Sequence, residues 1–223
     1  MEEEEIGAIL FMDIVGSSKL WKEKGKKFYR SLKQFEEFIL EKTRLFRGLV
    51  IKMIGDAFMI YFENLFNCLL FAISIQCKIL RLDNKSPIKI RIGICYGGDM
   101  WKKTLNIQNC EQIDFFGQTV NIASRMESKV ATVNGIGLSF NKEYDERTEL
   151  MFIDILNNVS QELKCNLKVK IIDFIDEEEK RPVRQPSGIN LDHFNPVTKK
   201  STELKGVGAL RAYLITLEEK YLI

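Results

Sequence analysis

Apolar residues in the first third of the chain follow the pattern of a strand, a helix and a hairpin. The first apolar run is continuous, which is typical of a strand buried on both faces. In the next stretch apolar residues recur at helical spacing, with Lys and Glu between them. Two short apolar runs then flank a Gly-Asp pair, which indicates a hairpin turn. These elements are a strand over residues 6–15, a helix that ends before Gly48, and strands over 49–54 and 57–62.

The same patterns continue to residue 140. The later elements are a helix over residues 65–80, a strand over 88–94, a helix over 118–129, and a short strand that ends near Phe140. Strands that alternate with helices returning to the same sheet favour an α+β fold over separate all-α or all-β layers. This order of elements predicts an α+β sandwich of the ferredoxin-like, split βαβ kind.

The stretch from residue 141 to residue 200 has a different character. It predicts a helix over residues 149–163 and an alternating strand over 167–175, followed by a polar loop with three consecutive glutamates and three prolines. A loop of this length is usually functional or disordered. A last alternating strand runs through Leu217. We expect a single domain over residues 1–223, because a chain of this length can bury one good core.

Composition narrows the function classes. The net charge of +2 gives no strong field toward nucleic acid or an anionic membrane, so we expect neither partner. The longest apolar stretch, residues 65–80, is interrupted by polar residues and is too short to span a bilayer. The five cysteines are odd in number and show no CxxC spacing, which favours a reducing compartment. Because the N-terminus is acidic and unlike a signal peptide, we expect a cytoplasmic protein.

Two carboxylates stand at the ends of predicted strands. Asp13 follows a run of apolar residues, and Asp56 lies in the turn of the predicted hairpin. If the hairpin packs beside the first strand, both carboxylates meet at one sheet edge, where paired carboxylates can hold a hard divalent cation. Each alone is more simply a turn residue. Gly16 and Ser17 open the following helix, where free backbone N–H groups attract phosphate, although a serine there is also an ordinary N-cap.

Four segments resemble the motifs of class III nucleotide cyclases and occur in the family's order. A chance match of four ordered motifs is much rarer than a chance match of one. The resemblance covers about residues 6–140 and 203–217 and implies the cyclase fold. The segments are residues 11–18 (FMDIVGSS), 52–59 (KMIGDAFM), 114–128 (DFFGQTVNIASRMES) and 204–208 (LKGVG).

The resemblance implies a role for each motif residue. Asp13 and Asp56 would hold two divalent ions per active site, Mg²⁺ or Mn²⁺, with the Ile14 carbonyl assisting. Lys52 and Asp114 match the pair that reads adenine in adenylate cyclases, where guanylate cyclases carry Glu and Cys. The chemistry agrees, because adenine N1 accepts a hydrogen bond and its N6 amino group donates one.

The remaining motif residues are assigned to the ribose and the phosphates. Asn121 and Arg125 are four residues apart on one predicted helix and so share a face. By resemblance, Asn121 orients the ribose, Arg125 stabilises charge on the α-phosphate, and Lys205 binds the terminal phosphates. Outside the motifs, a solvated helix face and a loop lysine would explain these side chains as well.

The chain departs from the family pattern in two places. Residues 141–200 exceed the usual connection, so we interpret them as an insertion within the domain. Some relatives carry a basic phosphate-binding residue before the third motif, whereas residues 110–112 (CEQ) offer none, with Lys102 or Lys103 as the nearest substitutes.

The resulting hypothesis is a nucleotide cyclase that converts ATP to 3′,5′-cyclic AMP and pyrophosphate. Family members complete each site across a dimer interface, so we expect a homodimer. Two alternatives stay open. One is a free-standing pyrimidine cyclase that makes cyclic UMP or cyclic CMP in anti-phage signalling. The other is a catalytically silent nucleotide-binding regulatory module.

Overall fold

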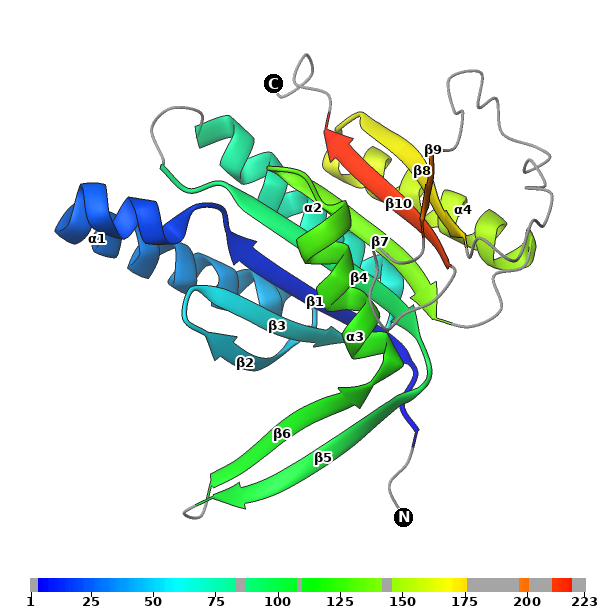
Figure 1. Ribbon diagram of the computed structural model, residues 1–223, viewed down its shortest axis with the longest axis horizontal. Coiled ribbons are helices and arrows are strands. Elements are labelled where there is room, and N and C mark those ends of the chain that lie inside the picture. Colours follow the sequence, from blue (N-terminus) through cyan, green and yellow to red (C-terminus); the bar gives the residue numbers. More distant parts are fainter. Residues whose placement is uncertain are drawn as a thin grey trace.

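The computed structural model describes residues 4–82, 87–107, 110–141, 146–175, 197–200 and 210–217. Its centre is an eight-stranded sheet in the order β2-β3-β1-β4-β7-β10-β8-β9 (Figure 1). The strands are β1 (Gly7–Ile14), β2 (Leu49–Ile54), β3 (Ala57–Phe62), β4 (Ile90–Gly97), β7 (Gly135–Asn141), β8 (Leu167–Ile175), β9 (Val197–Lys200) and β10 (Leu210–Leu217).

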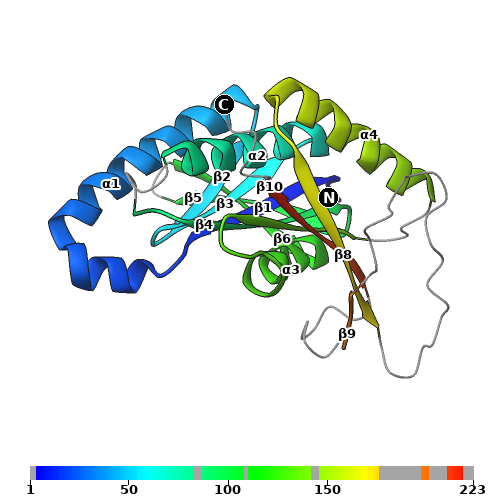
Figure 2. The same cartoon turned by 90° about the horizontal axis from the view of Figure 1, so that it is seen from above.

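The helices form a layer on each face of this sheet. Figure 2 shows α1 (Ser17–Leu45), α2 (Leu65–Leu82) and α4 (Glu146–Leu163) on one face and α3 (Gln118–Arg125) on the other. A π-helical turn, η2 (Met126–Val130), continues α3. The first four strands, with α1 and α2, have the order β2-β3-β1-β4 of a split βαβ unit, which confirms the predicted α+β sandwich.

The central strand β1 is apolar on both faces because both faces are covered. Leu10 and Met12 belong to the core under α1 and α2, whereas Ile9 belongs to a second core under α3. Side chains alternate along a strand, so Asp13 falls on the α3 face. The continuous apolar pattern of β1 therefore ends in a carboxylate on the face opposite α1 and α2.

Two features were not predicted. Residues 99–117, left without an element by the sequence pattern, contain the hairpin β5 (Met100–Ile107) and β6 (Cys110–Gly117), which projects from the body of the fold (Figure 1). The helix predicted over 118–129 is divided into α3 and η2. Helix α4 and strand β8 match their predicted type and join the main sheet and its helical layer. The interpretation of residues 141–200 as an insertion stays a prediction.

Helix α2 corrects the expectation that its stretch is too short for a membrane span. It has 18 residues with a mean hydropathy of 1.6, and by length and composition it could cross a membrane. However, 61% of that span is buried inside the fold, as in the core helix of a globular domain. It is the one such helix among the described residues.

Gly93 sets how closely α3 and η2 approach the sheet. A Cβ at Gly93 would overlap the backbone nitrogen of Glu127 and the backbone carbonyl of Ala123. We expect Gly93→Ala to lower the free energy of unfolding by at least about 2 kcal/mol, because both obstacles are backbone atoms that cannot rotate away. Urea unfolding of the purified variant measures this loss.

The matched control is Gly55→Ala. Gly55 has φ +65°, and no atom lies within 4 Å of the position that a Cβ would take there, so its substitution costs only backbone strain of about 1 kcal/mol. Equal losses in the two variants would contradict the packing role of Gly93.

Candidate active site

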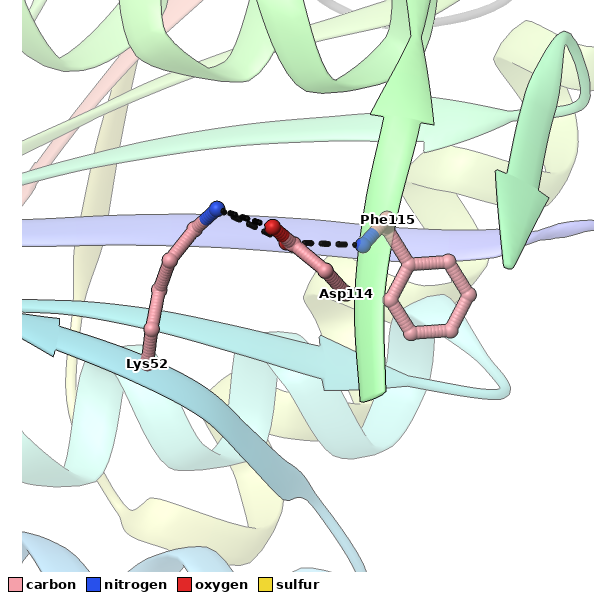
Figure 3. A network of polar contacts seen from close by, with 3 residues as sticks. All are labelled: Lys52, Asp114 and Phe115. Atoms are coloured by element: carbon pink, nitrogen blue, oxygen red, sulfur yellow. Dashed lines mark hydrogen bonds and ion pairs between the residues drawn. The ribbon is translucent and has the colours of Figure 1, made fainter. Parts of the chain in front are cut away.

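A lysine and an aspartate from distant parts of the chain form a close ion pair. Lys52 Nζ lies 2.7 Å from both Oδ1 and Oδ2 of Asp114, 62 residues away (Figure 3). The Asp114 Oδ1 atom also accepts a hydrogen bond of 2.9 Å from the Phe115 backbone N–H. The Lys52 and Asp114 side chains are 32% and 19% exposed, so the pair is partly desolvated yet open to solvent. The structure thus brings together the two residues expected to read the base.

A β-bulge directs Lys52 toward Asp114. The pairing of β2 with β3 shifts between Val50 and Lys52, so that Lys52 stands opposite Met59. Met59 belongs to the core under α3, and paired residues share a face, so Lys52 lies on that face. A bulge re-aims side chains in this way. Without it, alternation would place Lys52 on the opposite face of the sheet.

Ring stacking holds β6 against the main sheet. Phe115 stacks on Tyr61 of β3, with ring centroids 4.7 Å apart and an interplanar angle of 21°. Phe115 is only 2% exposed. Since Asp114 precedes Phe115, the buried ring fixes the position of the carboxylate beside β2. The hairpin is therefore anchored at the residues that carry the ion pair.

Asp13 belongs to a charged cluster on the α3 face. Arg91 Nη2 donates a hydrogen bond of 3.2 Å to Asp13 Oδ2, and it lies 3.0 Å from Glu127 Oε1. The contact with Glu127 is an ion pair by distance but lacks hydrogen-bond alignment, so Glu127 Oε1 is buried without a hydrogen-bond partner among the described residues. One guanidinium therefore serves two carboxylates.

Asp56 occupies the turn between β2 and β3, near the end of β1 that carries Asp13. Met12 pairs with Phe58, so Asp13 stands beside Ala57, the neighbour of Asp56. Asp56 Oδ2 is buried and has no hydrogen-bond partner within the described part of the chain. Burial, and secondarily the charge of Asp56, raises the pKa of Glu36 on α1. A buried carboxylate oxygen without a donor suits a cation ligand, so Asp56 fits the expected metal site, whereas the Asp13 carboxylate is paired with Arg91.

The start of α1 follows β1 directly. Ile14 is 1% exposed and ends β1, and Gly16 has φ +71°, a left-handed conformation that glycine adopts without strain. No side chain caps the helix, and its first turn contains no acidic residue. The first backbone N–H groups of α1 therefore donate to no side-chain cap. A helix start that binds phosphate needs such N–H groups to be available.

Asn121 and Arg125 lie on the outer side of α3. Their neighbours Ile122, Ala123 and Met126 pack against the sheet, whereas Asn121 is exposed and Arg125 is partly exposed. No hydrogen bond or ion pair joins Asn121 or Arg125 to another described residue. Lys205 and its motif fall outside the described residues.

Three residues at the site were not singled out from the sequence. Arg91 sits among alternating isoleucines in a strand, and Glu127 follows Met126 in the third motif. Glu36 on α1 is within electrostatic reach of Asp56. The position of Arg91 beside Asp13 follows from the register of β1 with β4, which pairs these two residues. Register is a long-range property that a single strand pattern does not reveal.

Glu127 should make stability depend on pH. Burial raises the pKa of its carboxyl above the ordinary value of 4.5, Arg91 opposes the shift, and Asp13 adds to it. The folded state therefore holds this proton more tightly than the unfolded state, and the associated stability is lost as pH rises through the folded-state pKa. We expect Glu127→Gln to be more stable than the original chain above that pH and equally stable below it. Thermal unfolding of both proteins from about pH 4 to about pH 8 measures the difference, and parallel curves would contradict it.

The family profile described as the adenylate and guanylate cyclase catalytic domain matches residues 1–142. The chain belongs to this family, the class III nucleotide cyclases.

Among curated relatives, an adenylate cyclase from Podospora anserina is 28% identical over 142 residues, which covers 54% of this chain and 6% of the relative. The chain thus spans a small fraction of the relatives' length.

Solved structures show the same fold. The guanylate cyclase domain of RhGC from Catenaria anguillulae, in complex with GTP, has a TM-score of 0.60 at 18% identity. The match covers 97% of this chain and 99% of that domain. The non-canonical dimeric guanylyl cyclase domain of the RhoGC fusion protein from Blastocladiella emersonii has a TM-score of 0.59 at 16% identity, and the match covers 97% of this chain and 99% of that domain. These similarities fix the cyclase fold, and the names of the relatives include both adenylate and guanylate cyclases.

Proposed function

We propose that this nucleotide cyclase domain converts ATP to 3′,5′-cyclic AMP and pyrophosphate. The observation that carries the proposal is the Lys52–Asp114 pair, in which both carboxylate oxygens lie 2.7 Å from the ammonium nitrogen. Lys52 can donate to adenine N1, and Asp114 can accept from the N6 amino group. Guanine presents a donor at N1 and an acceptor at O6, so it would meet a donor with a donor and an acceptor with an acceptor.

The free pair is ready to accept a base without large rearrangement. In the absence of a base each partner satisfies the other, so neither charge is left alone in a partly desolvated position. An adenine that binds beside the pair offers one acceptor to Lys52 and one donor to Asp114. Because the base presents a matching group to each partner, the site retains all its polar contacts.

Asp13, Asp56 and the Ile14 carbonyl would hold two divalent ions, Mg²⁺ or Mn²⁺, per active site. When bound, such ions make the ribose 3′-hydroxyl more acidic and stabilise charge on the departing pyrophosphate. Arg91, which pairs with Asp13, would keep Glu127 as its partner when Asp13 turns to the metal. The Arg91 guanidinium would therefore still have one carboxylate partner, Glu127, if Asp13 bound a cation.

Residues at the start of α1 and on α3 would bind the ribose and the phosphates. The N–H groups at Gly16 and Ser17 would bind phosphate oxygens at the start of α1. Asn121 would orient the ribose, and Arg125 would stabilise the charge that develops on the α-phosphate during attack of the 3′-oxygen. Lys205 would bind the terminal phosphates.

We further propose that two copies of the chain share each site. Asp13 and Asp56 would come from one protomer, and Lys52, Asp114, Asn121, Arg125 and Lys205 from its partner. Membership of the class III cyclase family, in which each site is completed across a dimer interface, supports this division. A cytoplasmic location is proposed on the free thiols of Cys68, Cys77, Cys95 and Cys165.

Product analysis tests the proposal. The purified chain is incubated with ATP, GTP, CTP and UTP in turn, with Mg²⁺ or Mn²⁺, and the cyclic product is identified by mass spectrometry. We expect cyclic AMP from ATP, and at least about 100-fold less of it from an Arg125→Ala control. Cyclic CMP or cyclic UMP as the main product would replace the proposal with a pyrimidine cyclase, and nucleotide binding without any product would replace it with a silent module.

A further inference from the structure

A basic groove lies in the helical layer on the face of the sheet opposite the site. It has a volume of about 260 Å³ and is bordered by α1, α2 and the end of α4. Lys42, Lys78 and Arg81 are among its lining residues, and none of the lining residues is acidic. The Cys77 side chain of α2 also lines the groove, although the residue is only 6% exposed. A buried thiol is thus reachable from solvent through a positively charged opening.

A second thiol lies beside Cys77. Cys165, which follows the end of α4, is 4% exposed, and its thiol is near enough to Cys77 that each thiol shifts the pKa of the other. Both cysteines are free. The backbone holds Cys165 in place, because its N–H donates to the Ser160 carbonyl. Helices α2 and α4 pack directly on one another, and Leu163 at the end of α4 lines the same groove as Cys77.

The two thiols differ from the other buried cysteines of the described chain. The hydrogen bond from Cys165 lowers the pKa of Cys77, burial opposes this, and Arg81 adds to the lowering. The same contact raises the pKa of Cys165. Burial raises the pKa of Cys68 and Cys95. Thiolate character makes a cysteine nucleophilic, so Cys77 is the reactive member of the pair.

We propose that Cys77 and Cys165 form a thiol-oxidation site, in which Cys77 reacts with a small hydroperoxide that enters by the basic groove and Cys165 converts the product to a disulfide. The groove admits a small polar oxidant, and the adjacent thiol supplies the second sulfur. Nothing in the cyclase reaction uses either cysteine.

The chemistry balances in two steps. The Cys77 thiolate attacks one oxygen of hydrogen peroxide, the O–O bond breaks, and sulfenic acid and hydroxide form. The Cys165 sulfur then attacks the Cys77 sulfur, the S–O bond breaks, and water leaves with the proton of the Cys165 thiol. Two thiols lose two electrons in total, and one peroxide becomes two waters.

The disulfide would join α2 to the segment after α4. It closes a loop between residues 77 and 165 and so restricts the unfolded chain. We therefore expect the oxidised protein to have a higher Tm than the reduced protein. Because the site lies across the sheet from Lys52, Asp114 and Asp13, its oxidation can be measured whether or not the chain cyclises ATP.

Peptide mapping of the full chain tests the proposal. The reduced protein is treated with a small excess of hydrogen peroxide, alkylated and digested without reductant. We expect a loss of two hydrogens from the intact mass and a Cys77–Cys165 crosslinked peptide that dithiothreitol releases. In Cys165→Ser we expect a sulfenic acid at Cys77, trapped by dimedone, and in Cys77→Ser no label at Cys165.

Three results would overturn the proposal. The first is an unmodified Cys77 under conditions that oxidise another cysteine of the chain. The second is oxidation of Cys77 to sulfinic acid in the original protein without any link to Cys165. The third is a disulfide in which Cys77 pairs with a different cysteine. Since the first measurement uses the unmutated protein, a failure of either serine variant to fold leaves it intact.

Discussion

A mixture of two inactive variants, Asp13→Ala and Arg125→Ala, should regain cyclase activity. Each variant alone is expected to lose at least about 100-fold in kcat, because each lacks a group that stabilises charge in the transition state. In a heterodimer, one site receives both defects and the other receives neither. With random pairing of equal amounts, about half of the dimers are mixed and each has one intact site of two, so the mixture should reach about a quarter of the original activity.

A matched control distinguishes a site shared between protomers from a case in which one variant merely stabilises the other. Asp13→Ala mixed with Asp56→Ala should stay inactive, because both aspartates are assigned to the same protomer and every site in the mixed dimer keeps one defect. Activity is measured as cyclic AMP formed per total protein after co-expression of the two chains. If the first mixture is as inactive as its components while size-exclusion chromatography shows dimers, the division of the site between protomers is wrong.

The double variant Lys52→Glu, Asp114→Cys should change the preferred base. The new carboxylate at position 52 can accept hydrogen bonds from guanine N1–H and the 2-amino group, and it repels the bare N1 acceptor of adenine. We expect kcat/KM for ATP to fall by about 100-fold or more and the GTP-to-ATP ratio of kcat/KM to rise, since mismatched polar groups in a site cost most when neither finds a partner. Steady-state rates with both nucleotides measure the ratio.

The single variants complete this test. Lys52→Ala leaves Asp114 as an unpaired charge that is 19% exposed, so it should impair both nucleotides rather than exchange them. A lysine away from the pair, Lys33 on α1, has a side chain that is 66% exposed, and Lys33→Ala should leave the ratio unchanged. An unchanged base preference in the double variant would show that Lys52 and Asp114 do not read the base.

Local patterns in the sequence were sufficient for most of the main sheet and its helices. The continuous apolar run of β1 and the helical spacing of Phe28, Leu32 and Phe35 reflect burial that each segment carries in its own residues. The β5–β6 hairpin was missed because its strands lie outside the main sheet and their exposed residues, Trp101 and Leu105 among them, do not alternate as a half-buried strand does.

The sequence motifs name candidate site residues, whereas the contacts between them come from the assembled sheet. Lys52 and Asp114 could be named from motifs, but their contact depends on a bulge between Val50 and Lys52 that no local pattern signals. The Arg91 contact with Asp13 depends on strand register in the same way. Interactions of this kind arise from the assembled sheet, so they become visible only when distant strands are placed side by side.

The projecting β5–β6 hairpin has a consequence for how substrate choice can change over time. This arm carries Asp114 but contributes no strand to the eight-stranded sheet, and its described pairing partners lie almost entirely within itself. Insertions, deletions and substitutions along most of its length would therefore leave the register of the central strands undisturbed. Half of the base-reading pair thus resides on this hairpin, whose outer part could vary between related cyclases while the buried Met100 and Phe115 keep its base packed on the main sheet.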